Sequence, residues 1–321
     1  MKVYTITLRP YLETLLTSDG LISGRVNRVR CVHSRAMGGG VLVGRMLRRL
    51  RVETSAFGLL GRENAGEYLH LLGDKAGECR FLQTDGRTDE RTLLRAGGAR
   101  LWLEQPGTAL ERKNFEVLAL ALLHRLEPGD LVVLCGFTRM TQGDGGLPQE
   151  LLVRFCRRVR AAGGRVAVDG VFSKLGALHA SQAQLVVLSH GQLKRLTGLT
   201  PSNPMRLRTA MAMAAGGFDG CILVPCGGST VSCLSGERLT RGCVSHYNMS
   251  SAVSGAWDSS LVHPRILAGY AAGLSMGLDE EACLQLSCSC ALPEFGRAGR
   301  WGKREILRTC ERALVREWNV S

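Results

Sequence analysis

The sequence predicts an α/β protein, in which a mostly parallel sheet is the middle of three α/β/α layers and a small β-sheet lid is attached. Two observations carry this prediction. Short apolar runs alternate with segments of helical periodicity over residues 111–225, which is typical of parallel strands joined by right-handed crossover helices. Runs such as 131–134 are apolar throughout, which indicates strands that are buried on both faces.

The first part of the chain is expected to supply the lid. Residues 21–35 alternate in part between apolar and charged side chains, and two further runs flank Gly97-Gly98, a hairpin signal. We therefore expect lid strands from about 9–36 and 88–106. The other elements predicted here are a strand at 3–8, a helix at 41–50, a strand at 52–60 and a helix after Gly66.

The rest of the chain supplies the remaining layers. The expected elements are, in order, helix 111–126, strand 131–135, helix 147–161, strand 165–169, strand 185–188, helix 190–197, helix 204–215, strand 221–225 and two helices at 264–276 and 279–292. The basic segment 297–321 is expected to carry a last helix at 302–317. With 321 residues, of which 45% are hydrophobic, the chain fits one large domain.

The composition indicates the cellular compartment and limits the kinds of site that the chain can carry. No apolar run approaches the roughly 18 residues of a membrane span, and the twelve cysteines include no CxxC pair. We therefore expect reduced thiols, no membrane segment, no metal-ligand cluster and a cytoplasmic protein. The seven histidines, His190 among them, show no metal-ligand spacing.

The net charge of +13 is best explained by solvated helix faces. Arg154, Arg157, Arg158 and Arg160, for example, lie opposite an apolar stripe. Nucleic-acid binding is not favoured, because aromatic residues are only 5% of the chain and none is interleaved with the arginines. Attraction of small anionic molecules is an equally good use of the charge.

Asp258 is the first candidate for a catalytic residue. It lies in the small-residue segment 254–260, ahead of a helical pattern. Backbone N–H groups at such a helix start can hold phosphate oxygens, and a carboxylate beside them can take the proton of an attacking hydroxyl. The alternative is that Asp258 is a helix cap. Pro264 leaves a second choice open: the helix begins there, or it begins near Asp258 and contains the proline.

Several motifs in order along the chain resemble those of one family. They are Thr7-Leu8-Arg9-Pro10-Tyr11-Leu12-Glu13, Gly38-Gly39-Gly40-Val41-Leu42-Val43-Gly44-Arg45, Gly58-x-x-Gly61-x-Glu63-x-x-Gly66, Gln105-Pro106-Gly107, Ser189-x-x-Gln192 and Gly255-Ala256-Trp257-Asp258-Ser259. From residue 3 to about 292 the chain resembles the phosphofructokinase-B-type carbohydrate kinases of the ribokinase superfamily, nearest the 1-phosphofructokinase and tagatose-6-phosphate kinase branch.

This resemblance implies ATP-dependent phosphorylation of a sugar or sugar phosphate, with Mg²⁺, and assigns roles. Asp258 would be the base, and the anion hole would be formed at Gly255, Ala256 and Trp257. The sugar side would comprise Arg9, Glu13, Gly38, Gly39, Leu42 and Arg91, and the nucleotide side Ser189, Gln192, Cys226, Gly227 and Gly228. Arg91 would hold the phosphate of a phosphosugar, the alternative being an exposed strand arginine.

Departures from the family pattern leave a second function open. Gly39 stands in place of a lysine, Leu42 in place of an asparagine, Gln192 in place of a glutamate and Trp257 in place of a glycine. Arg9 could supply the cation that is missing at Gly39. The alternative function is a weak or inactive relative that binds a nucleotide or phosphosugar in a regulatory role. Leu101 and Trp102 suggest a homodimer through the lid sheet, with core packing as the alternative.

Overall fold

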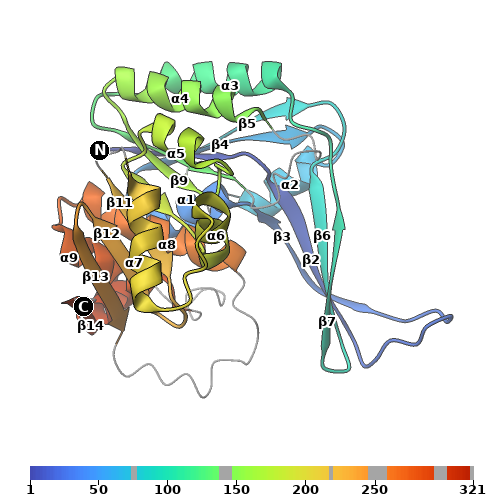
Figure 1. Ribbon diagram of the computed structural model, residues 1–321. Coiled ribbons are helices and arrows are strands. Elements are labelled where there is room, and N and C mark those ends of the chain that lie inside the picture. Colours follow the sequence, from blue (N-terminus) through green and yellow to red (C-terminus); the bar gives the residue numbers. More distant parts are fainter. Residues whose placement is uncertain (74–77, 137–146, 217–219, 245–258, 293–301, 319–321) are drawn as a thin grey trace.

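The computed structural model describes residues 1–73, 78–136, 147–216, 220–244, 259–292 and 302–318. A large sheet with helices on both faces forms the body, and a smaller sheet projects from one end of it as the lid (Figure 1). Among the helices that the structure describes, none combines the length and the hydropathy that crossing a membrane requires.

The main sheet has ten strands, seven of them parallel. The parallel part runs in the order β5 (Glu78–Thr84), β4 (Thr54–Gly61), β1 (Val3–Thr7), β8 (Leu131–Cys135), β9 (Arg165–Asp169), β10 (Leu185–Val187) and β11 (Cys221–Pro225). The antiparallel strands β12 (Val231–Ser235), β13 (Arg238–Val244) and β14 (Ala313–Glu317) follow β11. This confirms the predicted three-layer fold with a mostly parallel sheet.

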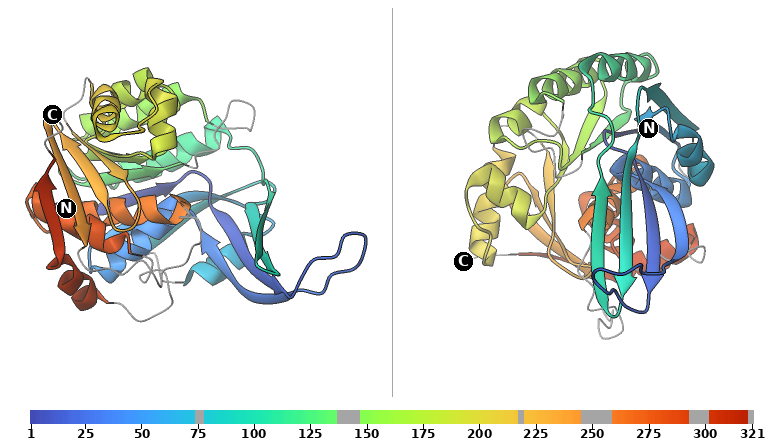
Figure 2. Two further views of the ribbon diagram at one scale, coloured as in Figure 1. Left: turned by 60° about the horizontal axis from the view of Figure 1, so that its bottom comes forward. Right: turned by 90° about the vertical axis from the view of Figure 1, so that its right-hand side faces the viewer.

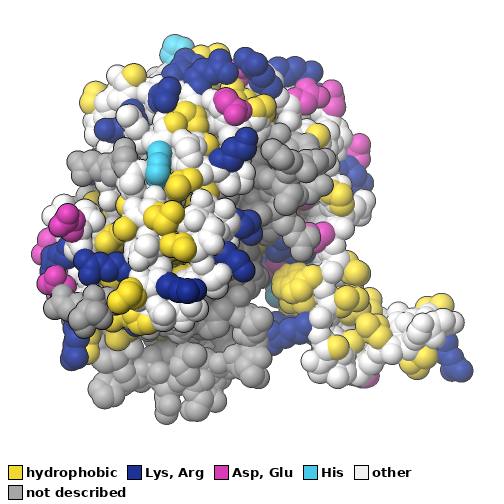
Figure 3. Space-filling model, viewed as in Figure 1, with side chains coloured by type: hydrophobic (Ala, Val, Ile, Leu, Met, Phe, Trp, Pro, Cys, Tyr) yellow, Lys and Arg dark blue, Asp and Glu magenta, His cyan; other side chains and the backbone are white. Residues whose placement is uncertain are grey.

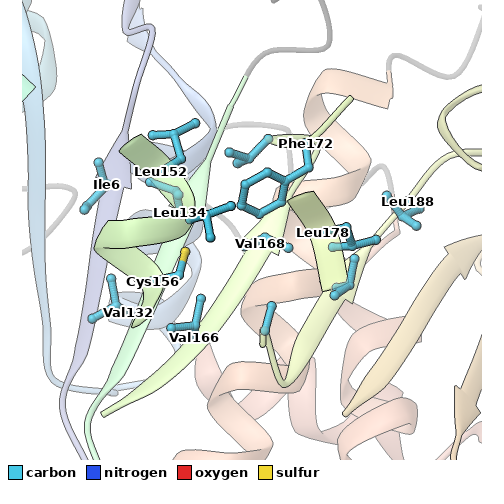
Figure 4. Close-up of a cluster of buried hydrophobic side chains, with 14 of the residues drawn as sticks. Ile6, Val132, Leu134, Leu152, Cys156, Val166, Val168, Phe172, Leu178 and Leu188 are labelled. Carbon is cyan, nitrogen blue, oxygen red and sulfur yellow. The ribbon is translucent and has the colours of Figure 1, made fainter. Parts of the chain in front are cut away.

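Helices cover both faces of this sheet. One face is covered by α3 (Arg112–Leu123), α4 (Gln149–Ala161), α5 (Leu175–Ser181), α6 (His190–Thr197) and α7 (Pro204–Ala215), and the other by α1 (Gly39–Arg49), α8 (Ser259–Ser275), α9 (Glu280–Cys290) and α10 (Lys303–Cys310) (Figure 2). Side chains of each buried strand alternate between the two cores. Val132 and Leu134 of β8 join the core beside α4 (Figure 4). Leu131 and Val133 join the core beside α1 and α8.

The lid is a four-stranded sheet from two separate parts of the chain. Its order is β3 (Arg30–Met37), β2 (Tyr11–Ser18), β6 (Asp89–Ala96), β7 (Ala99–Gln105), and β2 pairs with β6 in parallel. The helix α2 (Ala65–Leu72) packs against its base. Of the alternating segment 21–35, only residues 30–35 lie in a strand. Residues 21–29 form a loop instead, which the side chain of Asn27 closes by binding the backbone of Ile22 and Arg25.

The expected tail helix over 302–317 is also wrong beyond residue 310. The chain leaves α10 and returns as β14, which pairs with β13 along the edge of the main sheet. Backbone pairing along this edge outweighs the local helical pattern. In addition, β5, α5 and the hairpin of β12 and β13 were not anticipated from the sequence.

The structure decides between the two alternatives for Pro264. Helix α8 begins at Ser259 and contains Pro264. A proline inside a helix cannot donate to the carbonyl one turn earlier, so α8 carries one missing bond near its start. The predicted solvated face of α4 is confirmed, because its four arginines are exposed, and Lys and Arg side chains gather over α3 and α4 in Figure 3.

The crossing of α8 and α9 is close enough to require a glycine. A Cβ atom built on Gly269 would lie 2.7 Å from the carbonyl oxygen of Leu286 and 2.7 Å from the Cα of Ser287. Both are backbone atoms, so no side-chain rotation could relieve the contact. Helix α8, which packs against α1, is therefore fixed on α9 by this approach.

We expect Gly269→Ala to lower the free energy of unfolding by about 2 kcal/mol, because overpacking forces backbone shifts. The control is Gly66→Ala in α2, where nothing lies within 4 Å of the added methyl group, and which should gain about 0.5 kcal/mol from helix propensity. Urea denaturation of both variants measures the difference. Equal stabilities would contradict the described crossing.

Candidate functional site

Three parallel strands end together at one edge of the main sheet. Thr7 of β1 pairs in register with Cys135 of β8, which pairs with Asp169 of β9. The start of α1 lies against the same edge, since the Val41 amide donates to Thr7 Oγ1 over 3.1 Å. Ligands of open parallel sheets bind at this carboxyl edge, so the candidate site is built here.

The first residues of α1 touch the strand ends directly. A Cβ atom on Gly40 would lie 2.6 Å from Thr7 Oγ1, and one on Gly39 would lie 2.8 Å from the Cβ of Cys135. Any side chain at position 39 would therefore collide with Cys135. The packing therefore accounts for a glycine at position 39, where the resemblance implies a lysine. Leu42, one turn after Gly38, is half-buried.

A buried histidine and carboxylate meet at the same edge. His263 Nδ1 of α8 lies 3.1 Å from Asp169 Oδ1, and the two residues are only 5% and 6% exposed. Burial and then the charge of Asp169 raise the pKa of the Cys135 thiol. Cys135 is therefore a neutral packing residue at pH 7 and no nucleophile.

His263 was not singled out from the sequence. Its only signal is its place directly before Pro264, in the segment where the sequence left the start of the helix open. Asp169 was noted as the end of a strand, but no sequence pattern connects it to a histidine 94 residues away. The contact depends on the packing of α8 against β9, which local periodicity does not reveal.

Glu13, expected on the sugar side, is buried in the lid. Its side chain is 3% exposed, and the guanidinium of Arg35 on the neighbouring strand donates to Glu13 Oε1, with an Nε–Oε1 distance of 2.7 Å. The second carboxylate oxygen, Oε2, is buried and accepts no hydrogen bond from the described residues. Arg35 is a second residue that the sequence did not point to.

Arg91 lies one lid strand away, in register with Glu13. Its guanidinium pairs with Glu104 at 2.8 Å and lies 4.6 Å from the ring centre of Tyr11 and 5.4 Å from that of Trp102. The side chain is 11% exposed. Arg91 is thus a positioned cation rather than an exposed strand arginine, and its role as a phosphate ligand stays a prediction.

Arg9 is held at the base of the lid. Its Nε and Nη2 atoms donate to the two carboxylate oxygens of Asp89, at 2.8 and 2.7 Å. Such a bidentate pair fixes both partners. Arg9 therefore joins the starts of β2 and β6, and any role as the cation missing at Gly39 stays a prediction.

The start of α6 carries the nucleotide-side residues Ser189 and Gln192. They form a reciprocal capping box: the backbone amide of Gln192 donates to Ser189 Oγ, and the backbone amide of Ser189 donates to Gln192 Oε1 over 2.6 Å. His190 between them is half-buried, and burial, followed by the charge of Arg241, lowers its pKa. It is neutral at pH 7.

A protein cage for Mg²⁺ is not found in the part of the chain that the structure describes. Mg²⁺ is bound through carboxylates and phosphates, but Gln192 offers only an amide, already used in the cap. No group of three or more His, Cys, Asp or Glu side chains gathers among the described residues. These residues therefore do not fit a resident metal ion.

The remaining predicted residues divide into two groups. Cys226, Gly227 and Gly228 form the turn between β11 and β12, where Gly227 and Gly228 have φ of 95° and 58° and the Thr230 amide donates to Gly227 O. Such left-handed backbone favours glycine. Gly255, Ala256, Trp257 and Asp258 lie outside the described residues, directly before the first residue of α8.

Known proteins of similar sequence cover nearly the whole chain. The 1-phosphofructokinase of Rhodobacter capsulatus is 24% identical over 302 residues, which cover 93% of this chain and 92% of that protein. The 1-phosphofructokinase of Haemophilus influenzae is 22% identical over 277 residues, with 85% and 86% covered. No family model matches the chain.

Solved structures share the fold. Phosphofructokinase-2 from Escherichia coli in complex with fructose-6-phosphate superposes with a TM-score of 0.78 at 17% identity, over 97% of this chain and 98% of that one. The tetrameric inhibited form of the same protein gives 0.77 at 17% identity, with the same coverage. The chain is similar in sequence to 1-phosphofructokinases and shares the fold of phosphofructokinase-2. This confirms the resemblance and the fold that the motifs predicted.

We expect His263→Ala to lower the free energy of unfolding by about 3 kcal/mol, because it leaves the Asp169 carboxylate buried without this partner. His263→Asn, whose amide can replace the Nδ1 donor, should lose only about 1 kcal/mol. The exposed His124→Ala is the control. Chemical denaturation measures all three, and equal losses for the two His263 variants would contradict a hydrogen-bonding role.

Proposed function

We propose that the chain phosphorylates a sugar phosphate with ATP, transferring the γ-phosphoryl group to a hydroxyl of the sugar. The observation that carries this proposal is the sequence similarity to 1-phosphofructokinases over almost the full length. The buried Glu13 and the guanidinium of Arg91 in the lid support it, because a sugar phosphate offers both hydroxyl groups and an anion. The substrate class is a hexose monophosphate.

The roles are divided between the lid and the sheet edge. Glu13 would accept hydrogen bonds from sugar hydroxyls, and Arg91 would bind the phosphate already on the sugar, with Arg9, Gly38, Gly39 and Leu42 shaping the same side. On the other side, Ser189, Gln192 and the turn of Cys226, Gly227 and Gly228 would lie along the nucleotide. Mg²⁺ would arrive with ATP, held by its phosphates.

The chemical step needs a base and an anion hole. Asp258 would take the proton of the attacking hydroxyl while its oxygen bonds to the γ-phosphorus. The bond between that phosphorus and the β–γ bridging oxygen breaks, and ADP leaves with the electron pair. Amides at Gly255, Ala256 and Trp257 would hold the charge of the transferred group, a contribution worth about 10²–10³ in rate per donor.

One observation favours the second candidate function, binding without turnover. Gln192 stands where the family has a carboxylate, and its amide is already engaged in the cap of α6. A site without that negative charge orders Mg²⁺ less well. Together with Trp257 in place of glycine, this favours a relative that binds a nucleotide or phosphosugar in a regulatory role.

The decisive test is turnover by the wild-type chain and by Asp258→Asn. With Mg-ATP and fructose 1-phosphate, fructose 6-phosphate or tagatose 6-phosphate, we expect ADP formation by the wild type. We expect a loss of at least about 10³-fold in Asp258→Asn, because the base is removed with little change in shape. Asp19→Asn, at an exposed position in the lid loop, is the matched control.

The two candidate functions give different results in this experiment. Turnover that survives in Asp258→Asn would contradict the assigned base. No turnover by the wild type, combined with a thermal shift on adding ATP or a phosphosugar, would replace the kinase by the binding function.

We also propose that two copies associate through their lid sheets. All seven residues of the edge strand β7 are exposed, among them Leu101 at 45% and Trp102 at 42%, and hydrophobic side chains gather on the lid in Figure 3. Exposed apolar edge strands are surfaces for association. A protein of the same fold, phosphofructokinase-2, has been solved as a tetramer.

The expected species in solution is therefore a dimer at micromolar concentration. Leu101→Glu should shift it to a monomer, because a carboxylate cannot be buried unpaired in an apolar contact. Val117→Glu on α3, also an exposed apolar position at 53%, should leave the dimer intact. Sedimentation velocity measures the mass, and a dimeric Leu101→Glu would place the interface elsewhere.

A further inference from the structure

The lid carries a row of four charged residues across its strands. Arg35 of β3, Glu13 of β2, Arg91 of β6 and Glu104 of β7 are direct neighbours in register. Residues opposite one another in a sheet share a face, so cation and anion alternate along one line. The structure joins this row into two ion pairs, one between Arg35 and Glu13 and one between Arg91 and Glu104.

The row lies on the lid face that points away from α2. Leu12, directly before Glu13, and Ala36, directly after Arg35, pack with Tyr68 and Leu72 of α2. Because successive side chains of a strand point to opposite faces, Glu13 and Arg35 point the other way. Neither of them is part of the packing of the lid on α2.

The pairing of Arg35 with Glu13 is one-sided. Both the Nε and the Nη2 of Arg35 donate to the same carboxylate oxygen, Glu13 Oε1. An arginine beside a carboxylate more often spreads two donors over the two oxygens, as Arg9 does with Asp89. Here Oε2 is left buried with no donor among the described residues.

A buried carboxylate oxygen without a donor indicates a missing partner. Buried polar atoms are nearly always hydrogen-bonded, and Oε2 can only accept. The partner must therefore be a donor, and a sugar hydroxyl is one. The guanidinium groups of Arg35 and Arg91 flank this position, one strand away on each side, which suits a ligand that carries an anionic group beside its hydroxyls.

We propose that Arg35 is a positioning residue for substrate binding: it holds Glu13 by Oε1 so that Oε2 is presented to a hydroxyl of a phosphorylated sugar. This inference rests on the proposed function and adds a residue to it. Arg35 suits the task because its side chain is 35% exposed whereas that of Glu13 is 3% exposed. It can thus remain solvated while it fixes the buried carboxylate.

The test is a double-mutant cycle on the full chain. Arg35→Gln and Glu13→Gln are each expected to raise the KM for fructose 1-phosphate by about 10–100-fold, since a hydroxyl donor would lose its oriented acceptor. The KM for ATP should stay within about twofold. The KM of the double variant should be no higher than that of the more impaired single variant, because both changes disrupt the same pair of side chains. Arg30→Gln, on the same strand and exposed, should match the wild type.

Two further measurements keep the outcomes separate. Arg35→Lys, which keeps the charge but has one donor group, should fall between the wild type and Arg35→Gln, and thermal unfolding shows whether each variant is folded. If Arg35→Gln is unfolded, the KM of Arg35→Lys decides. If the KM of the folded Arg35 variant equals that of Arg30→Gln, the inference is overturned. Additive effects in the cycle overturn it too, because Arg35 would then contact the phosphate by itself.

The failure of this inference differs from the failure of the proposed function. If the wild type turns over a phosphosugar and Arg35→Gln has an unchanged KM, only the role of Arg35 is lost. If the wild type neither turns over nor binds any phosphosugar in a calorimetric titration, both are lost.

Discussion

The structure depends on the close approach of α1 to the ends of β1 and β8. Gly39 and Gly40 leave no room for a Cβ atom against Cys135 and Thr7, so the helix lies directly on the carboxyl edge. Its other side packs on α8, which in turn is fixed on α9 through Gly269. A bulkier residue at any of these glycines would move the helices that surround the site, although none of them reacts chemically.

Two buried carboxylates define the chemistry that this edge and the lid can support. Asp169 is paired with His263, and Glu13 with Arg35. Removing a charged group from water is costly unless it is paired, so each carboxylate is retained with one dedicated partner. Both partners come from a different element than the carboxylate itself, which ties α8 to the main sheet and β2 to β3. The site is therefore held together by the same groups that make it polar.

The sequence predicted the layers better than the polar contacts. Fully apolar runs such as 131–134 marked buried strands, and the order of the motifs indicated the family. The helix expected at 302–317 failed because β13 offers β14 an edge to pair with, which no local pattern encodes. Likewise, Arg35 and His263 acquire their meaning only through partners 22 and 94 residues away. Position 39 shows the reverse: the missing lysine was visible in the sequence, and the packing supplies the reason.

The lid is connected to the body where Arg9 and Asp89 meet. Arg9 precedes β2 and Asp89 opens β6, and the amide of Gly107, just after β7, donates to the same carboxylate over 2.7 Å. The segments that lead into β2 and β6 and the segment that leaves β7 are thus all bound at the Asp89 carboxylate. If the small sheet tilts as a whole about this point, the loop between β2 and β3, which projects farthest from the body in Figure 1, moves much farther than the row at Glu13. In such a tilt the residues close to the Arg9–Asp89 pair stay almost stationary, while the outer end of the lid moves through solvent.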